Sequence, residues 1–211
     1  MVPDRSFRKA VMQWESLPGE SVSGRIQISV IAWNIIYMSI SIKSIREAFG
    51  LLFESIHDRD FRKTIPLHQW SEKELLPLVR TFLLGRFGHC FPETSVRLPH
   101  CSSTQGRVDF LIGNIAVEFA VRRPGDQKAP LSTRVNRDEM IKLMLHDGPG
   151  LLVLFDFSRY PFNEEDIERF RDYPSLGKGN YRKSPFHVAY YYKAQAHPRK
   201  IEVIKKRIHV K

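Results

Sequence analysis

Two acidic residues, Asp109 and Glu118, lie in the middle of neighbouring apolar segments, residues 107–112 (RVDFLI) and 115–122 (IAVEFAVR). A Gly-Asn pair between the segments has the composition of a two-residue hairpin turn, so the segments are predicted to form adjacent antiparallel strands. Two carboxylates that face one spot repel each other, and each is costly to bury alone. A divalent cation removes this repulsion, because carboxylate oxygens are ligands that Mg²⁺ prefers. Magnesium held in this way, with waters and a phosphate oxygen, is typical of phosphodiester hydrolysis.

Side-chain alternation along a strand predicts which residues share a face with these carboxylates. In the first strand, the face opposite Asp109 is expected to carry Val108, Phe110 and Ile112. In the second strand, Ala120 and Arg122 are expected on the face of Glu118. Arg122 would therefore place a cation near the two acids.

The elements that position these strands follow from apolar periodicity and turn residues. We expect helices near residues 42–56, 71–85, 133–146 and 163–173, and strands at 26–31, 95–98, 107–112, 115–122, 151–157, 186–193 and 201–210. Ser71 with Glu74 three residues on forms a capping box, and Gly85 or Gly88 ends that helix, although Pro77 lies inside it. This order predicts the α/β class, with a mixed β-sheet flanked by helices.

The acids and the order of elements together resemble the PD-(D/E)XK nucleases, a restriction-endonuclease-like superfamily, over roughly residues 70–194. The family has an Asp on the second strand, which matches Asp109, and a Glu-x-Lys triplet on the third, which matches Glu118-Phe119-Ala120. The resemblance implies a restriction-endonuclease-like core and Mg²⁺ (or Mn²⁺) bound by Asp109, Glu118 and the Phe119 carbonyl. It also implies a further acid on the leading helix, for which Glu72 is the candidate, because Glu74 is engaged in the capping box.

The chain departs from this family at its basic residue, because Ala120 replaces the lysine that orients the attacking water. Arg122 is the expected substitute, although a guanidinium hardly releases a proton near neutral pH. Some members of the superfamily carry the basic residue on the crossover helix instead, and Arg137 and Lys142 are the candidates there.

Positive charge is concentrated at one end of the chain. Residues 177–211 carry ten Lys and Arg against one Glu, which places +9 of the net charge of +10 there. Clustered cations favour a polyanion partner such as DNA, whose phosphates release counterions on binding. The residues expected to contact nucleic acid are Lys178, Arg182, Lys183, Arg123 and Arg137. The alternative, a solubilising tail, stays open on charge alone.

The remaining sequence features limit the class of protein. Residues 1–60 are expected to form an N-terminal extension with a possible homo-oligomer contact, and residues 61–211 the nuclease-like domain. The apolar stretch at 26–42 is too short and too polar for a membrane span, and no nucleotide-binding P-loop is present. The two Cys, each preceded by His, do not have zinc-site spacing, and so few cysteines favour a cytoplasmic protein.

The sequence therefore leaves three hypotheses. The first is a Mg²⁺-dependent DNA endonuclease, a deoxyribonuclease in which Asp109, Glu118 and Arg122 are catalytic. The second is a catalytically inactive nuclease-fold module that binds DNA or a protein partner, which Ala120 favours. The third is a structural partner of a larger complex, with residues 26–53 as an interface.

Overall fold

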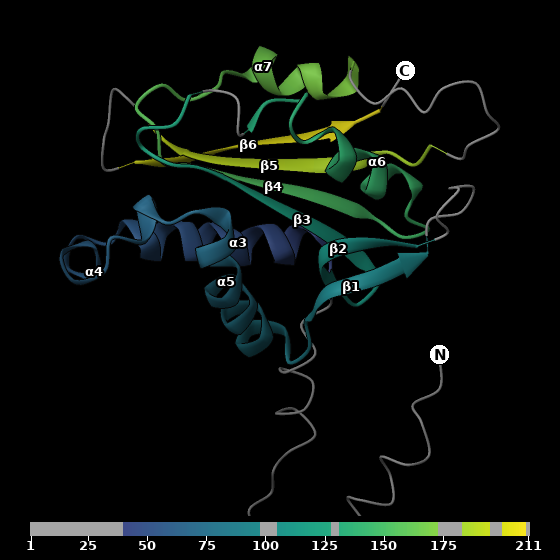
Figure 1. The fold of residues 1–211 in the computed structure, drawn as a ribbon, viewed down its shortest axis with the longest axis horizontal. Coiled ribbons are helices and arrows are strands. Elements are labelled where there is room, and N and C mark those ends of the chain that lie inside the picture. Colours follow the sequence, from purple (N-terminus) through teal and green to yellow (C-terminus); the bar gives the residue numbers. More distant parts are fainter. Residues whose placement is uncertain (1–39, 98–104, 128–130, 173–182, 195–199, 210–211) are drawn as a thin grey trace, which may run out of the picture. The chain divides into compact units, whose positions relative to one another are not determined.

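The computed structural model describes residues 40–97, 105–127, 131–172, 183–194 and 200–209 (Figure 1). The helices are α3 (Ile42–His57), α4 (Arg59–Thr64), α5 (Glu72–Phe87), α6 (Arg137–Leu145) and α7 (Glu164–Glu168), with short 3₁₀ turns η1 (Leu67–Gln69) and η3 (Arg169–Asp172). The strands are β1 (Phe91–Arg97), β2 (Gln105–Ile112), β3 (Ile115–Arg122), β4 (Gly150–Asp156), β5 (Phe186–Lys193) and β6 (Ile201–Ile208).

The six strands form one mixed sheet in the order β1-β2-β3-β4-β5-β6. β1, β2 and β3 pair antiparallel, β4 and β5 continue parallel to β3, and β6 returns antiparallel. β3 and β4 are buried along their whole length, as expected for the centre of a sheet that helices cover on both faces. The predicted mixed α/β sheet is confirmed.

Two apolar clusters lie on the two faces of this sheet. Helices α3 and α5 pack on one face, where Phe49, Phe53 and Phe155 make ring contacts. Helices α6 and α7 lie on the other face (Figure 1), where Met140, Leu143 and other apolar residues pack against the strands. β3 therefore runs between helices on both sides, and a polar group in it is shielded from water.

Helix α5 begins and ends where the sequence predicts. The Ser71 amide donates to the Glu74 carboxylate at 2.7 Å, which closes the capping box. Gly88 ends the helix with a φ of 72°, a left-handed conformation that glycine adopts without strain. Pro77 is accommodated inside the helix.

Some predicted boundaries differ from the structure. β1 begins at Phe91 rather than at residue 95, and α6 begins at Arg137 rather than at residue 133. The later start of α6 has a local cause, because the Asn136 side chain donates to the Ser132 carbonyl at 3.0 Å and holds a turn ahead of the helix. The strand predicted at 26–31 lies outside the described residues.

Helix α3 belongs to the same compact unit as the sheet. That unit spans residues 36–211, so the helix within the predicted extension of residues 1–60 packs with the sheet. The apolar face of α3, with Ile45, Phe49 and Phe53 fully buried, packs in the core of this unit. The part of the suggested oligomer interface that lies on α3 is therefore largely used within the fold.

No helix in the described segments is both long enough and apolar enough to cross a bilayer.

Candidate functional site

The candidate site lies where β2 separates from β3. Pairing between these strands runs from Ile112–Ile115 to Phe110–Val117, while β2 continues to pair with β1 as far as Gln105. Beyond Phe110, the Asp109 carboxylate accepts a hydrogen bond from the Phe119 amide at 2.8 Å. A side chain thus occupies the place at which a neighbouring backbone carbonyl would extend the ladder.

This separation changes the face that Val108 presents. Phe110 and Ile112 pack in the α3–α5 cluster, but Val108 packs with α6 on the opposite side of the sheet. The prediction that Val108, Phe110 and Ile112 share one face is therefore wrong for Val108. The reason is that regular alternation requires regular pairing, and pairing with β3 stops at Asp109.

Glu118 is buried in the middle of β3, with 1% of its surface exposed, and faces α6. The Lys142 ammonium on α6 lies 2.7 Å from Glu118 Oε1. Lys142 also donates to the Arg107 carbonyl on β2 at 2.9 Å. One lysine therefore connects α6 to both strands at the point where they separate.

The carboxyl groups of Asp109 and Glu118 lie close enough to interact. Burial, followed by the charge of Asp109, raises the pKa of Glu118 to about 9, against the opposing effect of Lys142. Burial also raises the pKa of Asp109, while hydrogen bonds from the Phe119 amide and from Glu118 act in the opposite direction. The structure therefore brings these two predicted residues together in a poorly solvated place.

Two further acids contribute to the same electrostatic field. Glu72, the first residue of α5, is an exposed residue. Desolvation of its carboxyl group, followed by the charges of Asp109 and Glu139, nevertheless raises its pKa to about 7. Glu139 lies one helical turn before Lys142, and its Oε2 is a buried oxygen without a hydrogen-bond partner in the described segments. Both acids thus lie near enough to the Asp109–Glu118 pair to interact with it electrostatically.

The donor set suits a hard divalent cation in its chemistry, because carboxylate oxygens predominate. The Phe119 carbonyl is a further oxygen at this edge, since the amide and the carbonyl of one strand residue point to the same side and its amide faces Asp109. Among the described residues, no set of three His, Cys, Asp or Glu side chains has an arrangement that could hold a metal ion. Two carboxylates and a carbonyl are thus the ligands that the described residues offer at this edge, and Glu72 is not grouped with them.

Arg122, the expected substitute for the family lysine, is engaged in another network. It is buried, and its Nε and Nη2 lie 3.0 and 2.5 Å from the two carboxylate oxygens of Asp156 at the end of β4. It also donates to Ser158 Oγ and to the Tyr160 carbonyl. Lys142, the alternative on the crossover helix, is the cation that contacts Glu118.

The three described residues that were predicted to bind nucleic acid lie on different elements: Arg123 follows β3, Arg137 begins α6 and Lys183 precedes β5. Arg123 is exposed and pairs with Asp126 at 3.0 Å. Arg137 pairs with Asp138 at 3.3 Å, and Lys183 is exposed before β5. Lys178 and Arg182 lie outside the described residues.

A groove that the sequence analysis did not identify leads to Asp109. It has a volume of about 730 Å³ between α5 and the β1–β2 hairpin, and Lys73, Arg80 and Arg107 line it. The groove also contains apolar surface from Leu76 and Phe110. The sequence signal was present, because residues 73, 76, 80 and 84 repeat at helical spacing along α5.

Comparison with known proteins gives no relationship. No protein-family model matches the chain, and no match was found among curated proteins or among solved structures.

Proposed function

We propose that this protein is a metal-dependent nuclease that hydrolyses phosphodiester bonds in DNA. The observation that carries the proposal is the convergence of Asp109 and Glu118 where β2 leaves β3, with the Lys142 ammonium 2.7 Å from Glu118. The resemblance to the PD-(D/E)XK superfamily implies a helix, a three-strand meander, a crossover helix and a further strand, and the order α5-β1-β2-β3-α6-β4 agrees with it. This agreement supports the proposal, independently of the side chains.

Asp109, Glu118 and the Phe119 carbonyl would hold Mg²⁺ or Mn²⁺. When bound, the cation would supply the positive charge that polarises the phosphate and acidifies a water molecule. Asp109 is held for this role by the Phe119 amide, which fixes one of its oxygens. Glu118 is held by Lys142.

Lys142 would supply the basic group that is missing at the motif position, where Ala120 replaces lysine. Its ammonium is anchored by the Arg107 carbonyl and retains partial access to solvent, with 23% of its side chain exposed. A lysine in this position can stabilise charge that develops on a phosphate oxygen, and it can exchange a proton more readily than a guanidinium can. Arg122 is thereby replaced in our assignment of the catalytic residues.

The groove beside Asp109 would hold the sugar-phosphate backbone. Lys73, Arg80 and Arg107 line it from α5 and β2, and clustered cations of this kind contact phosphates without reading the sequence. The basic segment after residue 177 would add long-range attraction.

The test is cleavage of a labelled DNA duplex and of a single strand in the presence of Mg²⁺ or Mn²⁺. We expect Asp109→Asn and Glu118→Gln to abolish cleavage, and Lys142→Met to lower the rate about 10²- to 10⁴-fold. Glu165→Gln, an exposed acid on α7, is the matched control and should cleave as the wild type does. Cleavage that survives in Asp109→Asn and Glu118→Gln would refute the assignment.

A catalytically inactive nuclease-fold module is the second candidate, and Ala120 in the motif position favours it. The two candidates differ in metal binding. Calorimetry with Mn²⁺, combined with gel shifts at increasing salt, separates them. Salt-sensitive DNA binding without metal binding and without cleavage would select the inactive module.

A further inference from the structure

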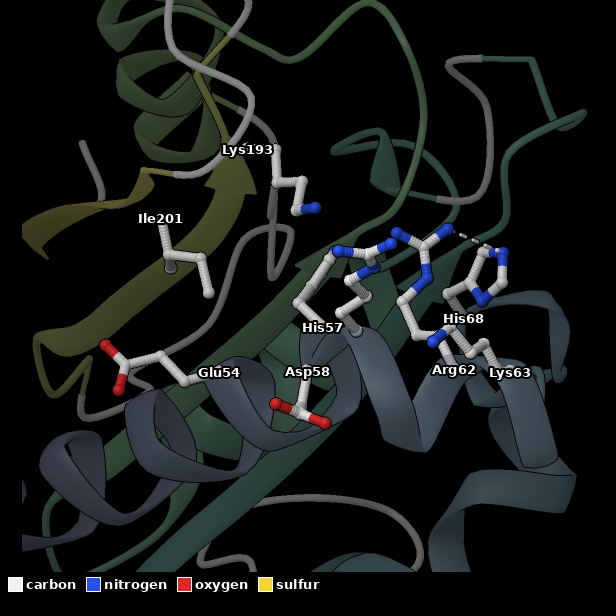
Figure 2. Close-up of a pocket in the computed structure, with 9 residues that line it drawn as sticks. Glu54, His57, Asp58, Arg62, Lys63, His68, Lys193 and Ile201 are labelled. Carbon is white, nitrogen blue, oxygen red and sulfur yellow. Dashed lines mark hydrogen bonds between the residues drawn. The ribbon is translucent and has the colours of Figure 1, made fainter.

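A second pocket lies away from the carboxylates, where the end of α3, α4 and η1 meet the end of β5 and the start of β6 (Figure 2). Its volume is about 730 Å³. Most of the residues that line it carry nitrogen-based side chains: His57, Arg59, Arg62, Lys63, His68 and Lys193. The pocket is thus a basic cavity, and it shares no lining residue with the groove at Asp109.

The two acids at this pocket do not neutralise its cations. Asp58 is used as the N-cap of α4, where it accepts hydrogen bonds from the Asp60 and Phe61 amides at 3.0 and 2.9 Å. Figure 2 shows the carboxylates of Glu54 and Asp58 on the side of the pocket opposite the side-chain nitrogens of Arg62 and His68. Neither of these two carboxylates therefore lies beside Arg62 in this view.

Arg62 and Lys193 have no carboxylate partner within 4.0 Å in the described part of the chain. The polar contact that Arg62 makes is with His68 Nε2 at 3.1 Å. The other ring nitrogen, His68 Nδ1, is buried and has no hydrogen-bond partner in these segments. Lys63, by contrast, is paired with Asp60 at 2.9 Å. Arg62 on α4 and Lys193 on β5 are thus available to a ligand, while His68 on η1 contacts the Arg62 guanidinium.

The basic groups of the pocket repel one another. Burial, and then the charge of Arg62, lower the pKa of Lys193. Burial, Arg62 and Lys193 lower the pKa of His68 in that order. Burial lowers the pKa of His57 to about 4, with Lys193, Arg62 and His68 contributing in the same direction. An anion would relieve this mutual repulsion.

We propose that this pocket binds a phosphate group through Arg62 and Lys193, with His68 positioning the Arg62 guanidinium. A guanidinium presents paired N–H donors that match phosphate oxygens, and an ammonium adds a strongly charged contact. The pocket is open and polar, which suits an ionic group attached to a larger molecule. The phosphate has two possible sources, the terminal phosphate of a nucleic acid strand and a small phosphorylated molecule, and both present the same chemistry.

The test is calorimetric titration of the full chain, in EDTA, with three probes: inorganic phosphate, a short 5′-phosphorylated oligonucleotide and the same oligonucleotide without its phosphate. Binding of the phosphorylated oligonucleotide at least tenfold more tightly than both other probes supports a strand end as the source. Comparable binding of inorganic phosphate and the phosphorylated oligonucleotide supports a small phosphorylated molecule.

Variants complete the test. Arg62→Met and Lys193→Met should each weaken phosphate binding about tenfold or more. Lys43→Met, which removes a lysine paired with Glu47 on the first turns of α3, is the matched control and should bind as the wild type does. Equal loss in all three variants, or no difference between phosphorylated and unphosphorylated probes, overturns the proposal. Asp109→Asn should leave phosphate binding unchanged, so the two proposals fail separately.

Discussion

Burial of the Asp109–Glu118 pair favours a bound proton at the candidate site. The pKa of Glu118 is about 9, first because the group is buried and second because Asp109 lies beside it. Near neutral pH, Glu118 is therefore mostly protonated, and Asp109 can accept a hydrogen bond from it. Cation binding requires the charged form of both acids, so metal affinity and proton release are coupled.

We expect the affinity for Mn²⁺ to rise with pH between about 7 and 9. The sign follows from the raised pKa of Glu118: a metal competes with a bound proton below that pKa, and the competition disappears above it. The rise should approach about tenfold per pH unit for one displaced proton. Calorimetry in two buffers of different ionisation enthalpy measures the proton release. Glu118→Gln should bind weakly at every pH, and a pH-independent affinity of the wild type would contradict the coupling.

The proximity of the two acids could be predicted from the sequence, whereas the basic residue beside them could not be singled out from Arg122, Arg137 and Lys142. Asp109 and Glu118 stand out because each interrupts an apolar strand and a hairpin brings them together. Arg122 was the nearest base in the sequence, but Asp156 lies beside it at the end of a parallel strand. That partner could not be recognised without knowing which strands pair. Lys142 contacts Glu118 from a separate helix, which spacing alone does not reveal.

At the scale of elements, a buried polar network joins the ends of β3, β4 and β5. Asp156 on β4 accepts hydrogen bonds from Arg122 on β3 and from the Tyr190 hydroxyl on β5. The Phe162 amide in turn donates to that hydroxyl at 2.6 Å. These contacts hold the strands that carry the site, since β3 bears Glu118.

Removing the hydroxyl of Tyr190 should therefore destabilise the fold. We expect Tyr190→Phe to lower the free energy of unfolding by about 1–3 kcal/mol, because it leaves the Phe162 amide and Asp156 buried without that partner. Tyr192→Phe is the control, because its hydroxyl bonds Glu202 at a less buried position on the same face of β5. It should cost less than about 1 kcal/mol. Urea denaturation measures both. Equal costs would show that the network does not stabilise the fold as we infer.

Most elements could be predicted because they are specified locally. β3 and β5 have the bounds that the apolar pattern predicts, and α5 has its capping box. The errors occur where distant contacts decide the structure. Val108 changes face because β2 leaves β3, and α6 starts late because Ser132 and Asn136 hold a turn. Neither interaction produces a periodic pattern.

At the scale of the whole molecule, α3 completes the core. Deletion of residues 1–35 should leave a folded protein, because the compact unit begins at Ile36. Deletion of residues 1–60 should abolish cooperative unfolding, because it removes the fully buried Phe49 and Phe53, each worth about 3–5 kcal/mol in a core. Circular dichroism during thermal denaturation tests the pair of deletions. A stable fragment beginning at residue 61 would contradict the role of α3.

Charge distribution gives a second prediction at this scale. Replacing Lys178, Arg182 and Lys183 together by Ala should weaken DNA binding and flatten its dependence on salt. Each phosphate contact that is lost reduces the slope of log K against log salt by about 0.9, so a decrease of up to roughly 3 is expected. Fluorescence anisotropy over a range of salt concentrations measures the slope. An unchanged slope would indicate that these three residues do not contact the backbone.

The hydrogen bond between the Phe119 amide and Asp109 also provides an internal spectroscopic probe. This β3 amide is bonded to an ionisable side chain and not to a backbone carbonyl. Its NMR chemical shift should follow the ionisation of Asp109, and its rate of hydrogen–deuterium exchange should follow how firmly that carboxylate is held. A single backbone resonance thus reports the state of the site directly, without substrate and without any substitution.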